Sequence, residues 1–418
     1  MKSQKLRATV AACVLATLGS QAFAAPADEL EFWGYMRAGL YSSTKDTPLG
    51  GYSLGGDLHF YRLGNEGGNY LEFMLGKKFD LGNGVKWGAH YMPTLNNGAT
   101  GTAQLYADIT GLDFAPEASL WAGQRWHRVQ DIHIVDNFLV VDGDNFGAGV
   151  DGINVGGAKL NISASTDASF DNKNNGSKHS TNDATRLNFQ LRDLPVNPGG
   201  KLTITGAAVS GSFAKGSNGG ALGLIHNQDI TADIKNTVFL QGSSGHASIT
   251  GKFYNLDSPA AAASVTVNPD GTVTGTPATL AGPQAGAEQF RIADAINWQL
   301  GDFGGQALVG YQTLTPDGGG KITDTSIGGR ISYGIAKHVK LMADLAVTQR
   351  MQDGMDTKNL NKATFAVAFS TDTKFWTRPE LRIYATRFNW NDAAKSSMGL
   401  ASNRNDVTLL GVQMEAWW

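Results

Sequence analysis

The feature that most constrains this chain is a two-residue alternation of apolar and polar side chains, sustained over segments of about ten residues. In the last segment, residues 407–418, every second side chain from Leu410 to Trp418 is apolar, and Gln413 and Glu415 stand between them. Successive side chains of a strand point to opposite faces. The same alternation recurs in residues 32–41, 70–75, 339–350 and 362–370. Each segment is therefore predicted to be a strand with one apolar face.

These segments favour a barrel that spans a membrane over a soluble sheet. A tilted spanning strand needs ~9–11 residues, whereas strands of soluble domains are usually ~5–6 residues long. A soluble β-sandwich alternates as well, but here the second face is polar without many partners that could be buried against it. We therefore predict an all-β transmembrane antiparallel β-barrel whose apolar face meets lipid.

The first 24 residues have the pattern of an export signal. Lys2, Lys5 and Arg7 precede an apolar run, and Ala22 to Ala24 form an A-x-A cleavage site. The run is shorter than the ~20 residues that span a bilayer. We predict cleavage of residues 1–24, a barrel over residues 25–418, and location in the outer membrane of a Gram-negative cell. Lipoprotein-type cleavage at Cys13, the only cysteine, is a less favoured alternative.

Length and charge narrow the class further. Roughly 390 mature residues, at about 20–24 for a strand and its connections, give about 16 to 18 strands, which is wide enough for an aqueous channel. Polar stretches at residues 165–185, 210–223 and 257–287 are predicted external loops. The net charge of −3 gives no reason to expect a nucleic-acid partner.

Motifs for chemistry are missing from the sequence. It contains no G-x-S-x-G, H-E-x-x-H or P-loop motif, so we expect neither an enzyme nor a cofactor. His127 and His133 lie near Asp131 and Asp136, but their spacing is not that of a tight metal site. We interpret them as polar side chains of the barrel lumen and predict no metal.

Aromatic side chains occur on the polar faces of several segments. The same faces carry both aromatic and charged residues. The aromatic residues are Tyr35, Tyr70, Trp376 and Trp417, and the charged residues include Arg37, Glu72 and Arg382. This combination suits a pyranose, whose C–H face stacks on a ring while its hydroxyls pair with charged groups. Membrane-interface girdles also use Tyr and Trp. A girdle role fits Trp418 but not Tyr70, because Leu71 and Phe73 take the lipid side there.

Ordered motifs then support a family resemblance. They are Phe32 to Arg37 (FWGYMR), Tyr61 to Glu66 (YRLGNE), Trp121 to Arg125 (WAGQR), Asp131 to Asp136 (DIHIVD), Asn197 to Gly200 (NPGG), Trp376 to Pro379 (WTRP) and Gln413 to Trp418 (QMEAWW). In these motifs the chain resembles the maltoporin family of sugar-specific outer-membrane porins.

The resemblance implies an 18-stranded barrel, an inward-folded constriction loop, a homotrimer surrounded by outer-membrane lipid, and passage of maltose or maltodextrin-type oligosaccharides. It implies an aromatic track formed by Tyr35, Tyr70, Phe239, Trp376 and Trp417. The polar and constriction positions that it implies are Arg37, Arg62, Glu72, Asp131, Asp136 and Phe138.

Departures from the family pattern leave the sugar open. The typical loop tryptophan has no counterpart in residues 96–104, although Tyr106 or Phe114 could replace it. Val129 stands at a constriction arginine position, next to Arg128, and Phe138 stands at a tyrosine position. A porin for another sugar class, of the sucrose or β-glucoside type, and a general diffusion porin therefore remain alternatives.

Overall fold

The computed structural model describes residues 29–42, 47–143, 145–167, 184–213, 215–258, 264–267, 273–276, 282–283 and 285–418. The predicted export signal, residues 1–24, lies outside the described residues. So do large parts of the external loops predicted at residues 165–185 and 257–287.

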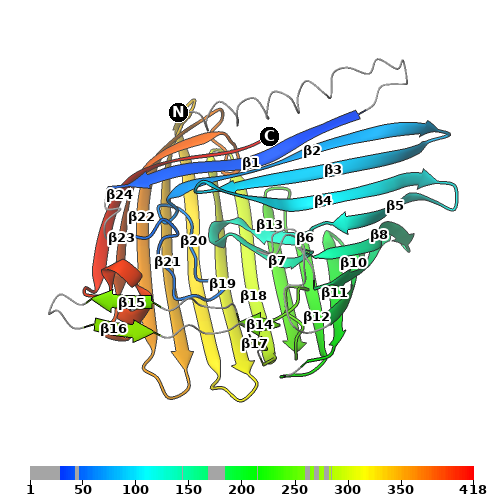
Figure 1. Ribbon diagram of the computed structural model, residues 1–418. Helices are drawn as coiled ribbons and strands as arrows, with labels where there is room; N and C mark the ends of the chain where they lie inside the picture. The colour runs from blue at the N-terminus through cyan, green and yellow to red at the C-terminus, as the bar shows by residue number, and fades with distance from the viewer. Residues whose placement is uncertain are drawn as a thin grey trace, which may run out of the picture.

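Within the described residues, eighteen antiparallel strands form one closed barrel (Figure 1). Each wall strand pairs with the next one along the chain, and the circle closes where β1 pairs with β24. The predicted fold class is thereby confirmed. The wall strands are β1 (Glu29–Tyr41), β2 (Gly68–Gly82), β3 (Val85–Asn96), β4 (Ala99–Leu112), β5 (Ala115–Gln124), β8 (Phe146–Val155), β9 (Ala158–Thr166), β10 (Ala184–Asn197), β11 (Gly200–Gly211), β12 (Gly219–Asp229), β13 (Ile234–Ser244), β18 (Ala287–Leu300), β19 (Phe303–Pro316), β20 (Ile322–Ala336), β21 (Val339–Gln352), β22 (Lys358–Ser370), β23 (Glu380–Trp390) and β24 (Asp406–Trp417).

Shorter elements lie in the connections between wall strands. They are β6 (His127–Ile132), η1 (His133–Val135), β7 (Asn137–Asp142), β14 (Asp257–Ser258), β15 (Ser264–Val267), β16 (Val273–Thr276), β17 (Gly282–Pro283), η2 (Asp392–Ser397) and η3 (Gly399–Ala401). Among the described residues, no helix is long and apolar enough to cross a membrane.

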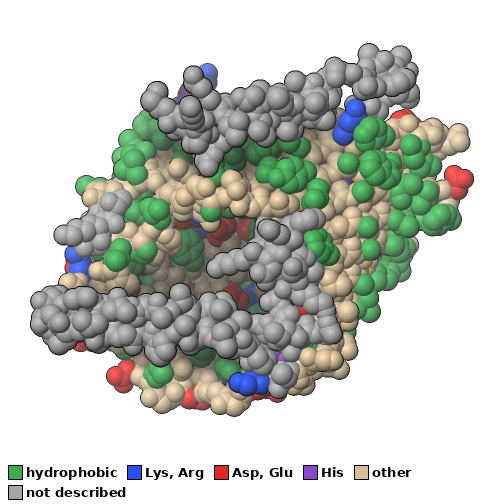
Figure 2. Space-filling view, in the orientation of Figure 1, with side chains coloured by type: hydrophobic (Ala, Val, Ile, Leu, Met, Phe, Trp, Pro, Cys, Tyr) green, Lys and Arg blue, Asp and Glu red, His purple; other side chains and the backbone are tan. Residues whose placement is uncertain are grey.

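The alternation seen in the sequence separates the two faces of the wall. On β23, Leu381 and Ile383 are exposed, whereas Arg382 and Tyr384, which alternate with them, are buried inside the barrel. Apolar side chains accordingly cover much of the visible outer wall (Figure 2). This arrangement fits lipid outside and polar groups inside.

Connection lengths distinguish the two ends of the barrel. At the end that holds the start of β1 and the finish of β24, most turns contain two to four residues, as at Asn83–Gly84 and Asp113–Phe114. The opposite end carries the longer connections, which marks it as the external side. The predicted loop at residues 210–223 is shorter than expected, because β11 and β12 extend to leave only residues 212–218 between them.

One external connection is short. β3 and β4 are joined by Asn97 and Gly98, whose φ angles of 49° and 90° suit a two-residue hairpin turn. No room is left there for a loop aromatic. Phe114 cannot replace it, because it lies in a turn at the other end of the barrel. Tyr106 lies within β4, and its ring stacks on His90 at 4.4 Å.

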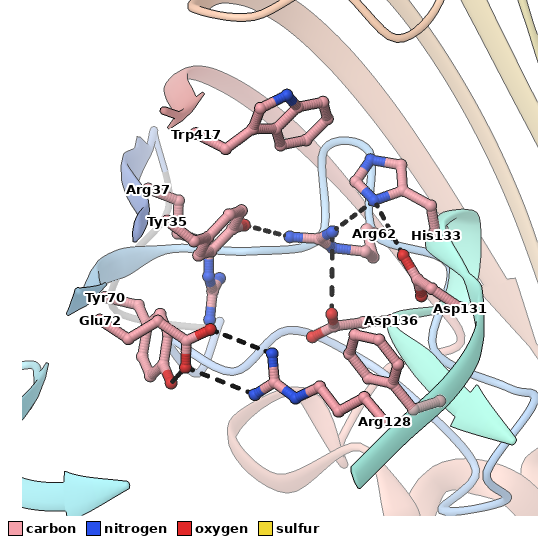
Figure 3. Close-up of a pocket in the computed structure, with 11 residues that line it drawn as sticks. Tyr35, Arg37, Arg62, Tyr70, Glu72, Arg128, Asp131, His133, Asp136 and Trp417 are labelled. Carbon is pink, nitrogen blue, oxygen red and sulfur yellow. Dashed lines mark hydrogen bonds and ion pairs between the residues drawn. The ribbon is translucent and has the colours of Figure 1, made fainter. Parts of the chain in front are cut away.

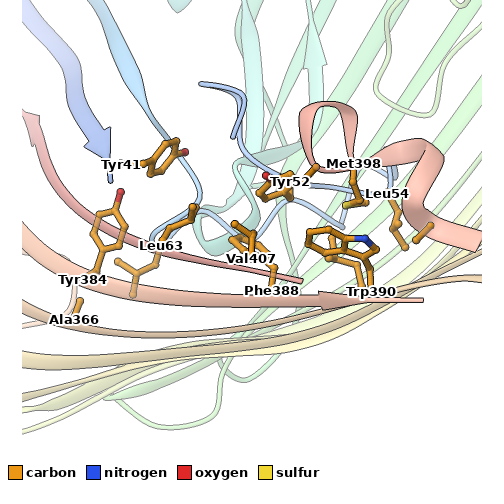
Figure 4. Close-up of a cluster of buried hydrophobic side chains, with 14 of the residues drawn as sticks. Tyr41, Tyr52, Leu54, Leu63, Ala366, Tyr384, Phe388, Trp390, Met398 and Val407 are labelled. Atoms are coloured by element: carbon orange, nitrogen blue, oxygen red, sulfur yellow. The ribbon is translucent and has the colours of Figure 1, made fainter. Parts of the chain in front are cut away.

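Among the described residues, two of the segments that fold into the barrel approach the lumenal cavity. The inner segment, residues 47–67, packs Tyr52 against Phe388 and Trp390 of the wall, with ring centroids 5.2 and 5.5 Å apart (Figure 4). The inner hairpin, residues 127–142, consists of β6, η1 and β7, and β6 pairs with β7. Ile134 and Leu139 of this hairpin are completely buried. The predicted inward-folded loop is therefore present.

On one side of the barrel, the charged side chains of the lumenal face are buried and form ion pairs. Arg330 and Lys362 both contact Asp344, at 3.1 and 2.6 Å, and Asp344 is completely buried. Nearby, Lys340 of β21 and Arg382 of β23 both pair with Glu380 of β23. The expectation of a polar face without many buried partners is thus wrong on this side. Because protein covers the wall, its charges are paired with each other rather than hydrated.

Candidate functional site

A cavity of about 400 Å³ lies in the lumen between the barrel wall and the inner hairpin (Figure 3). Strands β1, β2 and β24 supply one side, and the inner segment and inner hairpin supply the other. Its lining residues are Tyr35, Arg37, Arg62, Tyr70, Glu72, Arg128, Asp131, His133, Asp136, Phe138 and Trp417.

Strand register places the wall residues of this cavity. Tyr35 of β1 lies opposite Glu72 of β2 on one side and opposite Trp417 of β24 on the other. One register step further along the same face, Arg37 lies opposite Tyr70. Because residues paired directly across strands share a face, both rows project into the lumen.

The rings of this wall form two groups of contacts, one around Tyr35 and Tyr70 and one around Trp417. Tyr35 and Tyr70 lie with centroids 6.1 Å apart and planes inclined by 50°. Trp417 carries the guanidinium of Arg378 over its ring, at 4.4 Å from the centroid. His133 lies 5.7 Å from Trp417 and 5.3 Å from Trp376, so its imidazole connects these two indoles.

Arg62 ties the inner segment to the wall. Its Nε donates to Glu66 at 2.9 Å, and its Nη2 lies 3.0 Å from Glu415 Oε1. The same Nη2 donates to the Tyr35 hydroxyl, which in turn donates to Glu415 at 3.0 Å. Arg62 is buried, and these charge-assisted bonds hold the Tyr35 ring in a fixed position.

Two carboxylates of the inner hairpin face the cavity. Asp136 is half-exposed and has a left-handed backbone conformation, with φ 53°, at the end of η1. Desolvation inside the lumen, opposed by Arg62 and reinforced by Asp136, raises the pKa of Asp131 to about 7. Desolvation also raises the pKa of Asp136. For His133, burial favours the neutral ring and lowers its pKa well below the usual value.

Comparison with known proteins identifies the family. The sequence model described as LamB porin matches residues 30–418. The chain belongs to the LamB porin family. It is therefore an outer-membrane porin, a channel protein.

Solved porin structures resemble this LamB porin only remotely. Pseudomonas aeruginosa OccK3 (OpdO) has 11% identity and a TM-score of 0.48, covering 94% of this chain and 95% of that chain. Pseudomonas aeruginosa OpdQ has 10% identity and a TM-score of 0.47, covering 94% and 98%. Vibrio cholerae OmpT has 10% identity and a TM-score of 0.46, covering 95% and 100%. The assignment rests on the family match and on the barrel itself.

Most of the predicted site residues of this LamB porin come together in one cavity. Those that line it are Tyr35, Tyr70, Trp417, Arg37, Arg62, Glu72, Asp131, Asp136 and Phe138. Trp376 lies just outside the lining and is 40% exposed. Its predicted place on the polar face of a strand is wrong, because it lies in the connection between β22 and β23. Arg382, which was predicted on a polar face, is buried in the barrel wall, where it pairs with Glu380.

Phe239 corrects the predicted track. Its side chain is completely buried, among the apolar residues that join the wall to the inner hairpin, including Leu139 and Val140. Phe239 does point toward the lumen, but the inner hairpin covers it there. Phe239 therefore offers no free ring face and is removed from the track.

Arg128 lines the cavity of the LamB porin but was missed as a site residue. It donates from Nη1 to Glu72 at 3.1 Å and lies against the ring of Phe138, at 4.6 Å from the centroid. Alternation could not find it, because it lies in the loop. Its position beside Val129, where the family pattern has an arginine, was the available signal.

His127 does not join His133 in a metal site. It lies 3.0 Å from both Asp142 and Asp151, and these two carboxylates outweigh the effect of burial and raise its pKa to about 9. In the ranges that the structure describes, no group of three or more His, Cys, Asp and Glu side chains could hold a metal ion.

Proposed function

We propose that this LamB porin is a channel for facilitated diffusion of maltose or maltodextrin-type oligosaccharides, which pass along lumenal aromatic rings flanked by charged groups. One observation carries the proposal. Tyr35, Glu72 and Trp417 occupy one register row on three adjacent strands, so ring faces and a carboxylate meet in the same cavity. Such a cavity offers both kinds of contact that a pyranose makes.

The chemistry of passage follows from the two sets of groups. The rings of Tyr35, Tyr70 and Trp417 offer apolar surface to the C–H faces of a sugar. Asp131 and Asp136 accept hydrogen bonds from its hydroxyls, and Arg37 donates to them. Each contact is weak by itself, which is suitable for a channel because a bound solute must also leave.

Assembly and processing belong to the same proposal. The exposed apolar residues of the outer wall, such as Phe365 and Ile383, suit contact with outer-membrane lipid and with other copies in a homotrimer. Cleavage of residues 1–24 is proposed from the signal pattern. N-terminal sequencing of the protein from outer membranes tests this step, with Ala25 as the expected first residue.

A second candidate is a porin for shorter sugars of another class, such as sucrose or β-glucosides. Val129 is buried and has no guanidinium that could bind a sugar. Phe138 packs against Arg128 and has no hydroxyl that could bind one. The two-residue turn at Asn97 and Gly98 has no aromatic at the channel mouth. These features favour short ligands, for which a long external track is unnecessary.

Single-channel current in planar bilayers tests the proposal. A sugar that binds in the lumen interrupts the ion current, and the block saturates as its concentration rises. We expect saturable block by maltose or maltotriose, or by sucrose for the second candidate. A current that falls only in proportion to solution viscosity, with every sugar tested, is the behaviour of a general diffusion porin and overturns the proposal.

A further inference from the structure

We propose that Arg128 and Glu72 form a latch across the sugar path, and that Arg128 determines the width of that path. The inference rests on the proposed sugar channel for its functional consequence. The existence of a removable barrier in the lumen is inferred from the contacts of the two side chains alone. The Arg128–Glu72 pair is called the latch.

The latch joins two parts of the molecule that approach each other across the cavity. Arg128 comes from β6 of the inner hairpin, whose backbone pairing is with β7, and Glu72 comes from wall strand β2. Nη1 and Nη2 of Arg128 donate to the two carboxylate oxygens of Glu72, at 3.1 and 3.4 Å. Figure 3 shows this fork spanning the gap between the hairpin and the wall.

Both partners are held in the orientation that the latch needs. The guanidinium of Arg128 lies over the rings of Trp126 and Phe138, 4.0 and 4.6 Å from their centroids. Glu72 accepts a further hydrogen bond from the Tyr70 hydroxyl at 2.7 Å. A planar fork that is already positioned loses little freedom when it binds a carboxylate.

The closed latch leaves polar atoms unsatisfied. In the described part of the chain, Arg128 Nε and Asp131 Oδ1 are buried atoms without a hydrogen-bond partner. One is a donor and the other an acceptor, and both belong to residues that line the cavity. Buried polar atoms without partners are costly. A sugar hydroxyl can accept from the first and donate to the second once the side chains move.

One partner of the latch can be reached from the cavity. Arg128 is 31% exposed, whereas Glu72 is 6% exposed, so the arginine faces the open part of the cavity. An entering sugar can therefore displace Arg128 and replace its bond to Glu72 with hydroxyl contacts. Arg128 would then close behind each sugar ring and discriminate against branched or bulky solutes.

The experiment compares ion conductance and sugar block in four variants. Arg128→Met keeps the length of the side chain and removes the fork. Glu72→Gln weakens the other half, and the exchange Arg128→Glu with Glu72→Arg restores a pair of opposite charges. Arg387→Met is the matched control, because Arg387 pairs with Asp406 and both are nearly half-exposed, remote from the cavity lining.

We expect Arg128→Met and Glu72→Gln to conduct ions about 1.5-fold better or more, with maltotriose dissociating roughly fivefold faster, because one charge-assisted contact is lost. The exchanged pair should recover part of the wild-type conductance, and Arg387→Met should match the wild type. Wild-type conductance and dissociation rates in both Arg128→Met and Glu72→Gln would overturn the latch.

The two proposals fail in different ways. Absence of saturable block in the wild type overturns the sugar channel, but the conductance of Arg128→Met still decides whether the latch narrows the lumen. Should Arg128→Met not insert, cysteines at positions 72 and 128 can be joined by a short bifunctional thiol reagent. The joined latch should pass ions but no maltotriose, and cutting the link should restore passage; unhindered maltotriose passage through the joined latch overturns the proposal.

Discussion

Tyr35 and Trp417 lie directly opposite each other across the seam where the first and last strands close the barrel. Two residues at opposite ends of the chain thus share one cavity with Glu72, which faces Tyr35 from the other side. Tyr35 and Tyr70 lie on the paired strands β1 and β2, and Trp417 joins them only when β24 closes the barrel. Barrel closure therefore completes the aromatic wall in this porin.

The first prediction concerns Trp417 as a sugar platform. Trp417→Ala should weaken sugar block roughly several-fold, since an aromatic contact is worth on the order of 1 kcal/mol beyond burial, while ion conductance stays similar or rises. Tyr70→Ala should behave in the same way. Trp418→Ala is the control, because Trp418 packs against Phe32 and lies outside the cavity lining. Unchanged sugar affinity in both lumenal variants would exclude the platforms.

The second prediction concerns the charge of the constriction and its pH dependence. The pKa of Asp131 is raised to about 7, so this carboxyl is neutral below that pH and negative above it. Cation selectivity should therefore rise with pH between about 5.5 and 8.5, because acidic side chains attract cations. Reversal potentials measure it.

Asp131→Asn should flatten this pH dependence and lower the cation preference at high pH. Adding Asp136→Asn should reduce the preference further and weaken sugar binding, since both carboxylates accept hydrogen bonds from sugar hydroxyls. The control is Asp406→Asn, which alters a carboxylate outside the cavity lining. A pH profile that survives in Asp131→Asn would show that another group carries the charge.

Most of the wall could be predicted from the sequence, for a physical reason. Alternation with a period of two fixes the face of each side chain once the chain is extended, so Tyr70 and Trp417 were placed correctly in the lumen. The same rule placed Phe239 correctly by face. It could not show that the inner hairpin covers that face, because coverage depends on contacts between residues far apart in sequence.

Loops follow no such period, and there the sequence was less informative. Arg128 reaches the cavity because β6 turns it toward Glu72, a direction that no local pattern encodes. Phe114 was a candidate for the channel mouth, but it lies in the turn between β4 and β5, at the end of the barrel opposite the external side. The buried pairs around Asp344 were also missed, because a polar lumenal face looks the same whether water or protein covers it.

The third prediction concerns those buried pairs. Asp344→Asn leaves the cations of Arg330 and Lys362 without their shared carboxylate, and breaking a buried pair costs about 3–5 kcal/mol. Asp406→Asn removes the partner of Arg387, which is nearly half-exposed, and should cost at most about 1 kcal/mol. Urea unfolding in detergent micelles compares them. Equal loss of stability in both variants would contradict a special role for burial.

The fourth prediction concerns ligand length. The external connection between β3 and β4 is only Asn97 and Gly98, so it supplies no aromatic at the channel mouth. Longer sugars therefore gain little extra stacking, and affinity should rise only modestly from maltose to maltoheptaose. Titration of current block along this series measures the trend. A hundredfold rise, about 2.7 kcal/mol, would mean that another external surface binds long chains.

The most direct test of the sugar channel is block of wild-type single-channel current by a panel of mono- and oligosaccharides. The arrangement of Tyr35, Tyr70 and Trp417 beside Asp131 and Asp136 predicts block that saturates with concentration for at least one oligosaccharide. Current that declines linearly, to the same extent for every sugar of equal viscosity, would contradict a saccharide site in this lumen.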